Sequence, residues 1–238
     1  IYYKNMILNL GKILLYIMNI LQKINLFLAK NIQLLSHEIR KPHYEYEIFG
    51  KQFEKFVSNE ISNFLNSENI VHRNAFNKNE FPDIRLIDPK IAIDIKCGSH
   101  YSKKGSILVK TNNSQNDLGT IRSWTKKIEE FTEIYFIFVE YSLTPLEREI
   151  NRITFRPFYE YLGVKNDIIS YRLKDGNLRP KNFAEFDTPH ITSYDNFKHL
   201  LKATDRNRSI KLAKEHLRKL DKEDISELLK ELNITQSV

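Results

Sequence analysis

The chain has 238 residues, 41% of them hydrophobic, and only seven glycines and seven prolines, which excludes a low-complexity or collagen-like chain and allows a substantial core. Its single cysteine, Cys97, excludes an intrachain disulfide and a cysteine-rich zinc module, and it agrees with a reducing cytoplasm. A formal net charge of +7 favours a polyanionic partner, with nucleic acid ahead of a membrane surface.

Residues 1–36 are predicted to form an amphipathic helix in one or two pieces. Apolar residues recur there at the spacing of one helix face, namely at Leu10, Ile13, Ile17, Leu21, Ile24 and Leu28. Lys12 and Lys23 leave about ten uncharged residues between them, roughly half the length that spans a bilayer, so no membrane span is expected. This segment is instead a candidate dimerisation element, with the final helices of the chain as the alternative. The natural start of the protein is expected at Met6 or Met18.

Residues 37–204 are predicted to form one α/β core. The elements expected in it are a linker at 40–50, a helix at 50–66, a short strand and polar loop in 71–80, strands at 82–87 and 91–97 that turn at Asp88-Pro89, a polar loop at 101–119, a helix at 120–132, an interior strand at 133–142, a strand at 152–163 and a loop at 175–190. A further helix begins after Ser193 or Asp195 as N-cap, and residues 205–238 are predicted to form one or two charged helices. This order predicts a mixed sheet flanked by helices.

The stretch EFPDIRLIDPKIAIDIKCGS, residues 80–99, places charged residues in strands that are otherwise apolar. One face of its second strand is apolar throughout, with Ile91, Ile93, Ile95 and Cys97. Asp94 and Lys96 share the opposite face. If the two strands form an antiparallel hairpin, Asp83 lies across from the end of the second strand, and the three charged groups meet. The alternative is a solvated Asp–Lys pair on an exposed hairpin.

Two carboxylates and a lysine that converge in this way suit metal-assisted hydrolysis of a phosphodiester. Asp83 and Asp94 would bind Mg²⁺, with the backbone carbonyl of Ile95 as a further ligand. A bound Mg²⁺ activates a water molecule and stabilises the charge that develops on the phosphate. Lys96 would orient or deprotonate that water, or stabilise the same charge.

Pro82-Asp83 followed by Asp94-Ile95-Lys96 resembles the active-site signature of the PD-(D/E)XK nucleases. The amino-acid sequence of residues 80–99 is similar to that of the active-site hairpin of type II restriction endonucleases of the EcoRV group. The resemblance implies a restriction-endonuclease-like core, in which Asp83 and Asp94 are the catalytic metal-binding carboxylates and Lys96 is the catalytic lysine. It also implies a catalytic glutamate on the preceding helix, for which Glu54 is the best match and Glu60 the alternative.

Polar segments around the hairpin are expected to contact DNA, with plain polar loops as the alternative for each. In the segment that follows the motif, the ammonium groups of Lys103 and Lys104 would bind phosphates. The side-chain amides of the same segment would pair with adenine edges, at Asn112, Asn113, Gln115 and Asn116. These amides favour an A·T-containing recognition site. The resemblance places a minor-groove loop at Asn77, Lys78 and Asn79, and a major-groove loop at Asn177, Arg179, Lys181 and Asn182.

The resemblance implies a site-specific type II restriction endonuclease that cuts double-stranded DNA with Mg²⁺ in the cytoplasm and leaves 5′-phosphate ends. It also implies a homodimer that reads a palindrome, a cognate DNA methyltransferase in the host, and blunt ends. The alternative within nucleases is a Holliday-junction resolvase or a repair or transposon nuclease of the same superfamily. From other classes, the alternatives are a non-catalytic DNA-binding module and a membrane-surface protein that uses residues 1–36.

Overall fold

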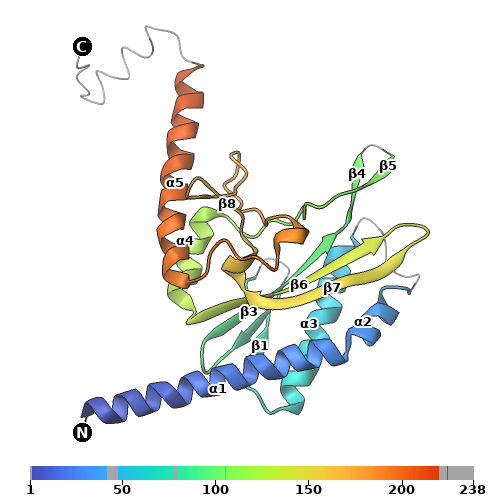
Figure 1. Ribbon diagram of the computed structural model, residues 1–238, viewed down its shortest axis with the longest axis vertical. Helices are drawn as coiled ribbons and strands as arrows, with labels where there is room; N and C mark the ends of the chain where they lie inside the picture. Colours follow the sequence, from blue (N-terminus) through green and yellow to red (C-terminus); the bar gives the residue numbers. More distant parts are fainter. Residues whose placement is uncertain (1, 42–47, 78–79, 105, 220–223, 225–238) are drawn as a thin grey trace.

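A mixed five-stranded sheet in the order β1-β2-β3-β6-β7 forms the centre of the fold (Figure 1). The computed structural model describes residues 2–41, 48–77, 80–104, 106–219 and 224, with the backbone alone for 2–10 and 12–14. The strands of the sheet are β1 (His72–Asn74), β2 (Ile84–Leu86), β3 (Ile91–Ser99), β6 (Glu133–Leu143) and β7 (Arg148–Pro157). β3 and β6 are parallel, and the other neighbours are antiparallel. The mixed α/β fold predicted from the sequence is therefore confirmed.

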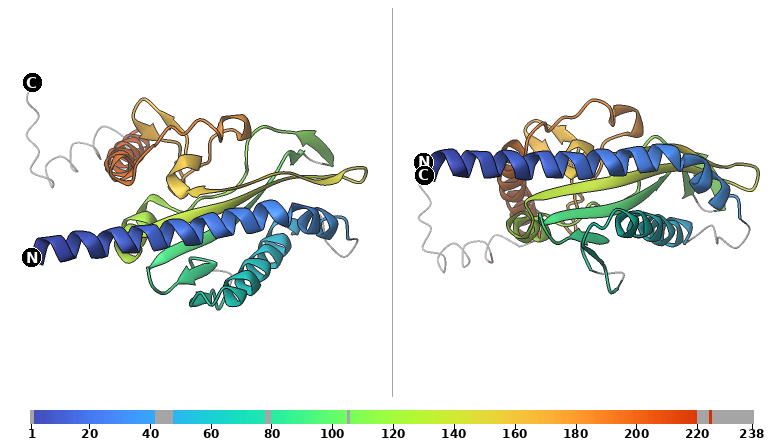
Figure 2. Two further views of the ribbon diagram at one scale, coloured as in Figure 1. Left: turned by 60° about the horizontal axis from the view of Figure 1, so that its bottom comes forward. Right: turned by 90° about the horizontal axis from the view of Figure 1, so that it is seen from below.

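Helices cover both faces of this sheet (Figures 1 and 2). The helices are α1 (Tyr2–Lys30), α2 (Ile32–Glu38) and α3 (Phe49–Ser67) on one face, and α4 (Ile121–Glu130) and α5 (Tyr194–Leu217) on the other. Each layer has its own apolar core. Among the helices that the structure describes, none combines the length and the apolar character needed to cross a membrane.

The alternation of side chains along β3 and β6 explains why both strands are almost continuously apolar. In β3, Ile93 and Ile95 belong to the core beneath α1 and α3, whereas Ala92 belongs to the core beneath α4 and α5. In β6, Ile137 belongs to the first core and Phe136 to the second. Both faces of these strands are therefore buried, as in the interior of a layered α/β sheet.

Most of the predicted helices are confirmed, and one loop prediction and one strand prediction are corrected. The segment 101–119 is not a loop throughout, because β4 (Tyr101–Lys104) and β5 (Ile107–Lys110) pair as an antiparallel hairpin. The strand predicted at 152–163 ends at Pro157, and a 3₁₀ helix, η1 (Phe158–Tyr161), follows it. The remaining short elements are β8 (Val164–Lys165), β9 (Ile168–Ile169) and η2 (Phe183–Glu185).

The two ends of the chain show how far the predicted boundaries hold. The helix predicted over residues 1–36 is present as α1 and α2. Ser193, not Asp195, is the N-cap of α5, because its Oγ accepts the N–H of Asn196 at 3.2 Å. α5 then runs without a break through the boundary predicted after residue 204. Residues 42–47 of the linker predicted at 40–50 lie outside the described residues, as do residues 220–223 and 225–238 of the predicted C-terminal helices.

Candidate active site

Two carboxylates hydrogen-bond to the edge of β3 at the point where its neighbour β2 stops. Ile84 of β2 pairs with Ile93, and among the described strands none pairs with β3 on this side beyond that point. The backbone groups of alternate residues point to the same side of a strand, so those of Ile95 and Cys97 point past the end of β2. Asp83 Oδ2 accepts the N–H of Ile95 at 2.6 Å. Two residues further along the strand, Glu54 Oε1 accepts the N–H of Cys97 at 3.1 Å.

These contacts come directly from the predicted hairpin and from the helix before it. The strands pair antiparallel, as expected, and Asp83 precedes β2 by one residue, so its side chain reaches the edge of β3. Glu54 lies on α3 one position after buried Phe53, which packs under the sheet. Glu54, and not Glu60, therefore reaches the site.

Asp94 and Lys96 lie on the face of β3 opposite to Ile93 and Ile95. Lys96 Nζ lies 2.5 Å from Asp94 Oδ2, and the two side chains are 21% and 7% exposed. Lys96 Nζ also donates to the carbonyl oxygen of Ile95 at 3.4 Å. Burial lowers the pKa of Lys96, but the negative charges of Asp94, Glu54 and Asp83 outweigh that effect and hold the pKa above its ordinary value. Lys96 is therefore a cation throughout the physiological range.

Two acids of this site, Asp83 and Glu54, have pKa values well above the ordinary values of carboxyl groups. Burial, with a contribution from Asp94, raises the pKa of Asp83 to about 7 against the opposing charge of Lys96. Burial also raises the pKa of Glu54 to about 7, against the opposing effects of Lys96 and of the Cys97 N–H. Carboxyl groups that are desolvated together are typical of sites that bind a cation or exchange protons.

The donor atoms suit Mg²⁺, although the side chains are not arranged around a metal position. Asp83, Asp94 and the carbonyl of Ile95 supply the hard oxygen ligands that Mg²⁺ prefers. The hydrogen bonds of both aspartates described above use Oδ2. Within the described part of the chain, no group of three or more His, Cys, Asp or Glu side chains is arranged to hold a metal ion. The site therefore fits Mg²⁺ in the chemistry of its donor atoms.

A cavity of about 670 Å³ opens onto these residues. The residues that line it include Glu54, Asp83, Asp94 and Lys96. The start of α4 and the loops around it also line the cavity, with Gly119, Thr120, Ser123, Lys127 and Asn177. Lys127 is a residue of this site that the sequence analysis missed. The only sequence signal for it is its position one helical turn after Trp124, on a helix that precedes an interior strand.

The two segments expected to contact DNA beyond the hairpin pair with each other beside this cavity. Backbone hydrogen bonds of 3.0 and 2.9 Å join Leu118 and Gly119 to Leu178. A bridge also joins Asn113 to Asn182. Segments more than 50 residues apart in the chain therefore form one surface at the mouth of the site.

Several of the predicted DNA contacts are already engaged within the protein. The amide of Asn116 donates to the carbonyl of Cys97 at 2.9 Å, and Arg179 Nη1 lies 2.5 Å from Asp117 Oδ1. Asn182 Nδ2 donates to Glu185 at 2.8 Å. Lys181 is 5% exposed and its ammonium donates to the carbonyl of Thr188 at 2.8 Å, so it supports this loop from inside.

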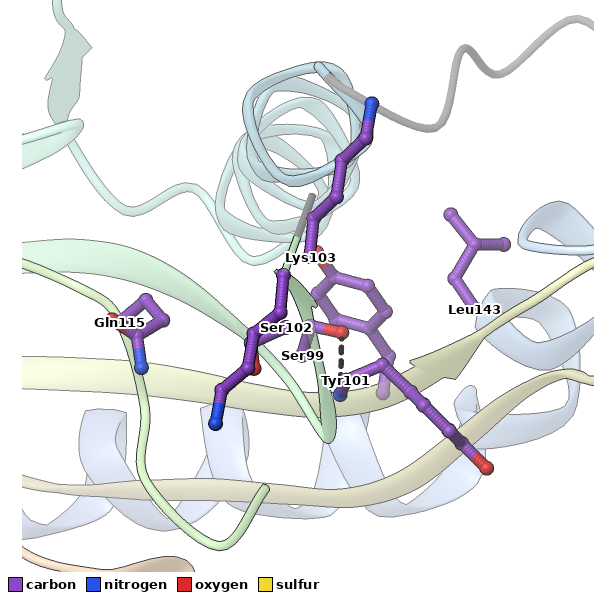
Figure 3. Close-up of a pocket in the computed structure, with 8 residues that line it drawn as sticks. Ser99, Tyr101, Ser102, Lys103, Gln115 and Leu143 are labelled. Carbon is purple, nitrogen blue, oxygen red and sulfur yellow. Dashed lines mark hydrogen bonds between the residues drawn. The ribbon is translucent and has the colours of Figure 1, made fainter. Parts of the chain in front are cut away.

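Other predicted contacts remain on the surface. Exposed side chains are found at Asn77, Lys103, Lys104, Asn112, Asn113 and Gln115. Lys103, Lys104 and Gln115 line a second cavity of about 580 Å³ beside the β4–β5 hairpin, where Ser99 Oγ accepts the N–H of Tyr101 at 3.0 Å (Figure 3). Lys78 and Asn79 lie outside the described residues.

Comparisons with known proteins give a distant structural likeness and no sequence relative. No protein-family model matches the chain, and no curated protein matches it. Among solved structures, the chain is similar to the NlaIV restriction endonuclease, with a TM-score of 0.45 and 12% sequence identity, over 73% of this chain and 76% of that one.

Proposed function

We propose that the protein is a Mg²⁺-dependent, site-specific endonuclease of the type II restriction class that hydrolyses double-stranded DNA and leaves 5′-phosphate ends. One observation supports this proposal above the others. Asp83, Asp94, Lys96 and Glu54 meet at the unpaired edge of β3, on the wall of an open cavity. Two carboxylates, a lysine and an acid with a raised pKa form a set suited to phosphodiester hydrolysis.

The side chains have distinct roles in this proposal. Asp83 and Asp94 would hold Mg²⁺ with the carbonyl of Ile95, and the ion would supply an activated water and charge stabilisation at the phosphate. Lys96, paired with Asp94 and cationic, stabilises negative charge on the phosphate as water attacks phosphorus. The bond from phosphorus to the 3′ oxygen breaks, so the phosphate stays on the 5′ end. Glu54 adds negative charge and holds the edge of β3 through Cys97.

A homodimer belongs to the same proposal, because a twofold enzyme matches a palindromic site. The outer face of α1 supports it, since Leu15, Met18 and Leu26 are 70%, 59% and 52% exposed there. The opposite face of the same helix packs on the sheet through Ile20 and Ile24. The N-terminal half of α1 also extends beyond the sheet (Figures 1 and 2). A host methyltransferase that protects the same sites follows from the restriction role alone.

The proposal is tested by digesting unmethylated phage DNA with the purified protein in Mg²⁺ and in EDTA. Discrete fragments are expected in Mg²⁺ only, and sequencing their ends would give the recognition site and the cut geometry. Asp94→Asn should abolish the fragments, whereas Asp88→Asn, on the exposed turn of the same hairpin, should leave them unchanged. A Mg²⁺-dependent smear would indicate a non-specific or structure-selective nuclease. Binding of DNA without cleavage would indicate a non-catalytic module.

A further inference from the structure

Lys127 is held toward the active-site cavity by a helix that is fixed at its start. Thr120 caps α4, with its side chain accepting the N–H of Ser123 at 3.1 Å. Trp124 is fully buried and stacks on Phe158, with 3.9 Å between the two ring centroids. Its Nε1–H donates to the carbonyl of Leu118 at 2.8 Å. Lys127 follows Trp124 by one turn, so anchoring of the tryptophan also sets the direction of the lysine.

The ammonium group of Lys127 lies against two aromatic rings and one backbone turn. Its Nζ is 3.6 Å from the ring centroid of Phe81 and 4.7 Å from that of Trp124. Gly119, with φ of +93°, passes so close that a Cβ atom there would stand 3.2 Å from Nζ. Phe81 directly precedes Pro82-Asp83, so the same ring that contacts the lysine belongs to the catalytic hairpin.

The ammonium groups of Lys96 and Lys127 differ in their distance from carboxylates. Lys96 is paired with Asp94 at 2.5 Å. By contrast, no carboxylate of the described residues lies within 4.0 Å of Lys127 Nζ. Burial lowers the pKa of Lys127 to about 8, against the opposing effect of the Asp94 charge. Lys127 is thus a partly desolvated cation that faces an acidic cavity without an acidic partner of its own.

We propose that Lys127 binds a non-bridging oxygen of the DNA phosphate that enters this cavity, as a second cation in addition to Lys96. This inference rests on the proposed nuclease function and adds a substrate contact to it. A phosphate that enters the cavity approaches the carboxyl groups of Glu54, Asp83 and Asp94, and a second cation in the cavity lining offsets part of the repulsion from those that are ionised. The two aromatic rings keep the ammonium group in place, so it needs little rearrangement when the phosphate arrives.

The test compares Lys127→Met, Lys127→Arg and Lys126→Met, the last of which changes an exposed lysine on the same helix. Two measurements are made with each variant. The first is cleavage of unmethylated phage DNA in Mg²⁺ under single-turnover conditions. The second is the affinity for a short fluorescent duplex in EDTA as a function of salt, which needs no metal. Thermal unfolding of each variant checks the fold.

Loss of a phosphate contact has two expected signatures. Lys127→Met should slow cleavage about 10²-fold and reduce the salt dependence of duplex binding by about one counterion, while Lys127→Arg retains most of both. Lys126→Met should match the wild type in both measurements. A slower cleavage with an unchanged salt dependence would overturn the phosphate contact and leave Lys127 as a support for the hairpin.

Two further outcomes separate this inference from the proposed function. If wild type and Lys127→Met cleave equally well, the inference is wrong and the nuclease function stands. If the wild type neither cleaves nor binds DNA, the nuclease function fails and the role of Lys127 fails with it. A lower melting temperature for Lys127→Met alone would assign the lysine to stability, because removal of a buried ammonium group without an acidic partner should otherwise preserve or raise stability.

Discussion

The side chain of Glu54 and the backbone N–H of Cys97 are joined by a hydrogen bond of 3.1 Å across 43 residues of sequence. This bond fixes the helix α3 to the edge of the strand that carries Asp94 and Lys96. A change at Glu54 therefore alters both the negative charge of the site and the position of one of its walls.

Glu54→Gln separates these two contributions. Glutamine keeps an oxygen that accepts the Cys97 N–H, so the fold should persist while the charge is lost. Under the proposed function, cleavage of phage DNA in Mg²⁺ should fall about 10²-fold. Glu60→Gln, on the same helix and outside the cavity, is the matched control and should cleave as the wild type does. Equal activity of the two variants would remove Glu54 from the catalytic set.

The raised pKa values predict an unusual pH dependence of stability for the metal-free protein. Glu54 and Asp83 both have pKa values of about 7 in the folded protein, above their ordinary values of 4.5 and 3.8. Between those limits the folded state binds more protons than the unfolded state, so the free energy of unfolding falls as pH rises toward and past 7. The expected loss from Glu54 is about 3 kcal/mol over the whole range, of which about 2 kcal/mol falls between pH 5.5 and pH 8. Urea unfolding in EDTA at these two pH values would measure that part, and Glu54→Gln should flatten the profile.

Addition of Mg²⁺ should reverse part of that loss. A cation that binds Asp83 and Asp94 only when they are ionised stabilises the folded state more at pH 8 than at pH 5.5. Melting temperatures with MgCl₂ and with EDTA at both pH values would show the difference. In Asp83→Asn the Mg²⁺-dependent shift should disappear. An equal shift in that variant would place the bound ion elsewhere.

Gly98 should tolerate no side chain, although it lies beside the site and contributes no chemistry. A Cβ atom there would stand 2.7 Å from a ring carbon of Phe138 and 3.0 Å from Phe183, both of which are buried. We expect Gly98→Ala to destabilise the protein by about 1–3 kcal/mol in urea unfolding. Gly11→Ala is the control, since nothing lies within 4 Å of a Cβ on that helical residue, and it should stabilise slightly. Equal stability of Gly98→Ala and the wild type would contradict the packing.

The proposed homodimer predicts that the molecular mass in solution depends on the exposed face of α1. Light scattering after gel filtration should give twice the 28.3 kDa of one chain for the wild type. Leu26→Glu, which places a charge on the exposed face of α1, should give the monomer. Ile210→Glu, at a comparably exposed apolar residue of α5, should remain dimeric. A monomeric wild type would rule out this interface at the concentrations used.

The hairpin could be predicted from the sequence because it depends on local rules. Alternation placed Ile95 in one core and Asp94 on the opposite face, and the register followed from the turn at Asp88-Pro89. Alternation and register together were enough to predict that Asp83 lies near the end of β3. The choice between Glu54 and Glu60 needed the packing of α3, because both lie on one helix and only the tertiary structure decides which faces the strand edge.

Contacts between distant segments could not be predicted in the same way. Lys127 reaches the cavity because Trp124 packs on Phe158, and nothing in the local pattern of α4 indicates that partner. Likewise, Asn116 and Arg179 read as exposed polar residues, yet each bonds to a part of the chain that folding brings beside it. The β4–β5 hairpin was missed because its strands have only four residues each and neither has a buried face, so the apolar residues of β5 do not alternate with polar ones.

The carboxylates that border β3 have a further consequence for the integrity of the protein. A strand edge with open N–H groups is a surface on which another chain can add a strand. Asp83 and Glu54 accept two of these N–H groups and so leave them unavailable to another chain. Two residues of the proposed catalytic set therefore also protect the strand edge from edge-to-edge self-association, and a variant with alanine at both positions should aggregate more readily than the wild type.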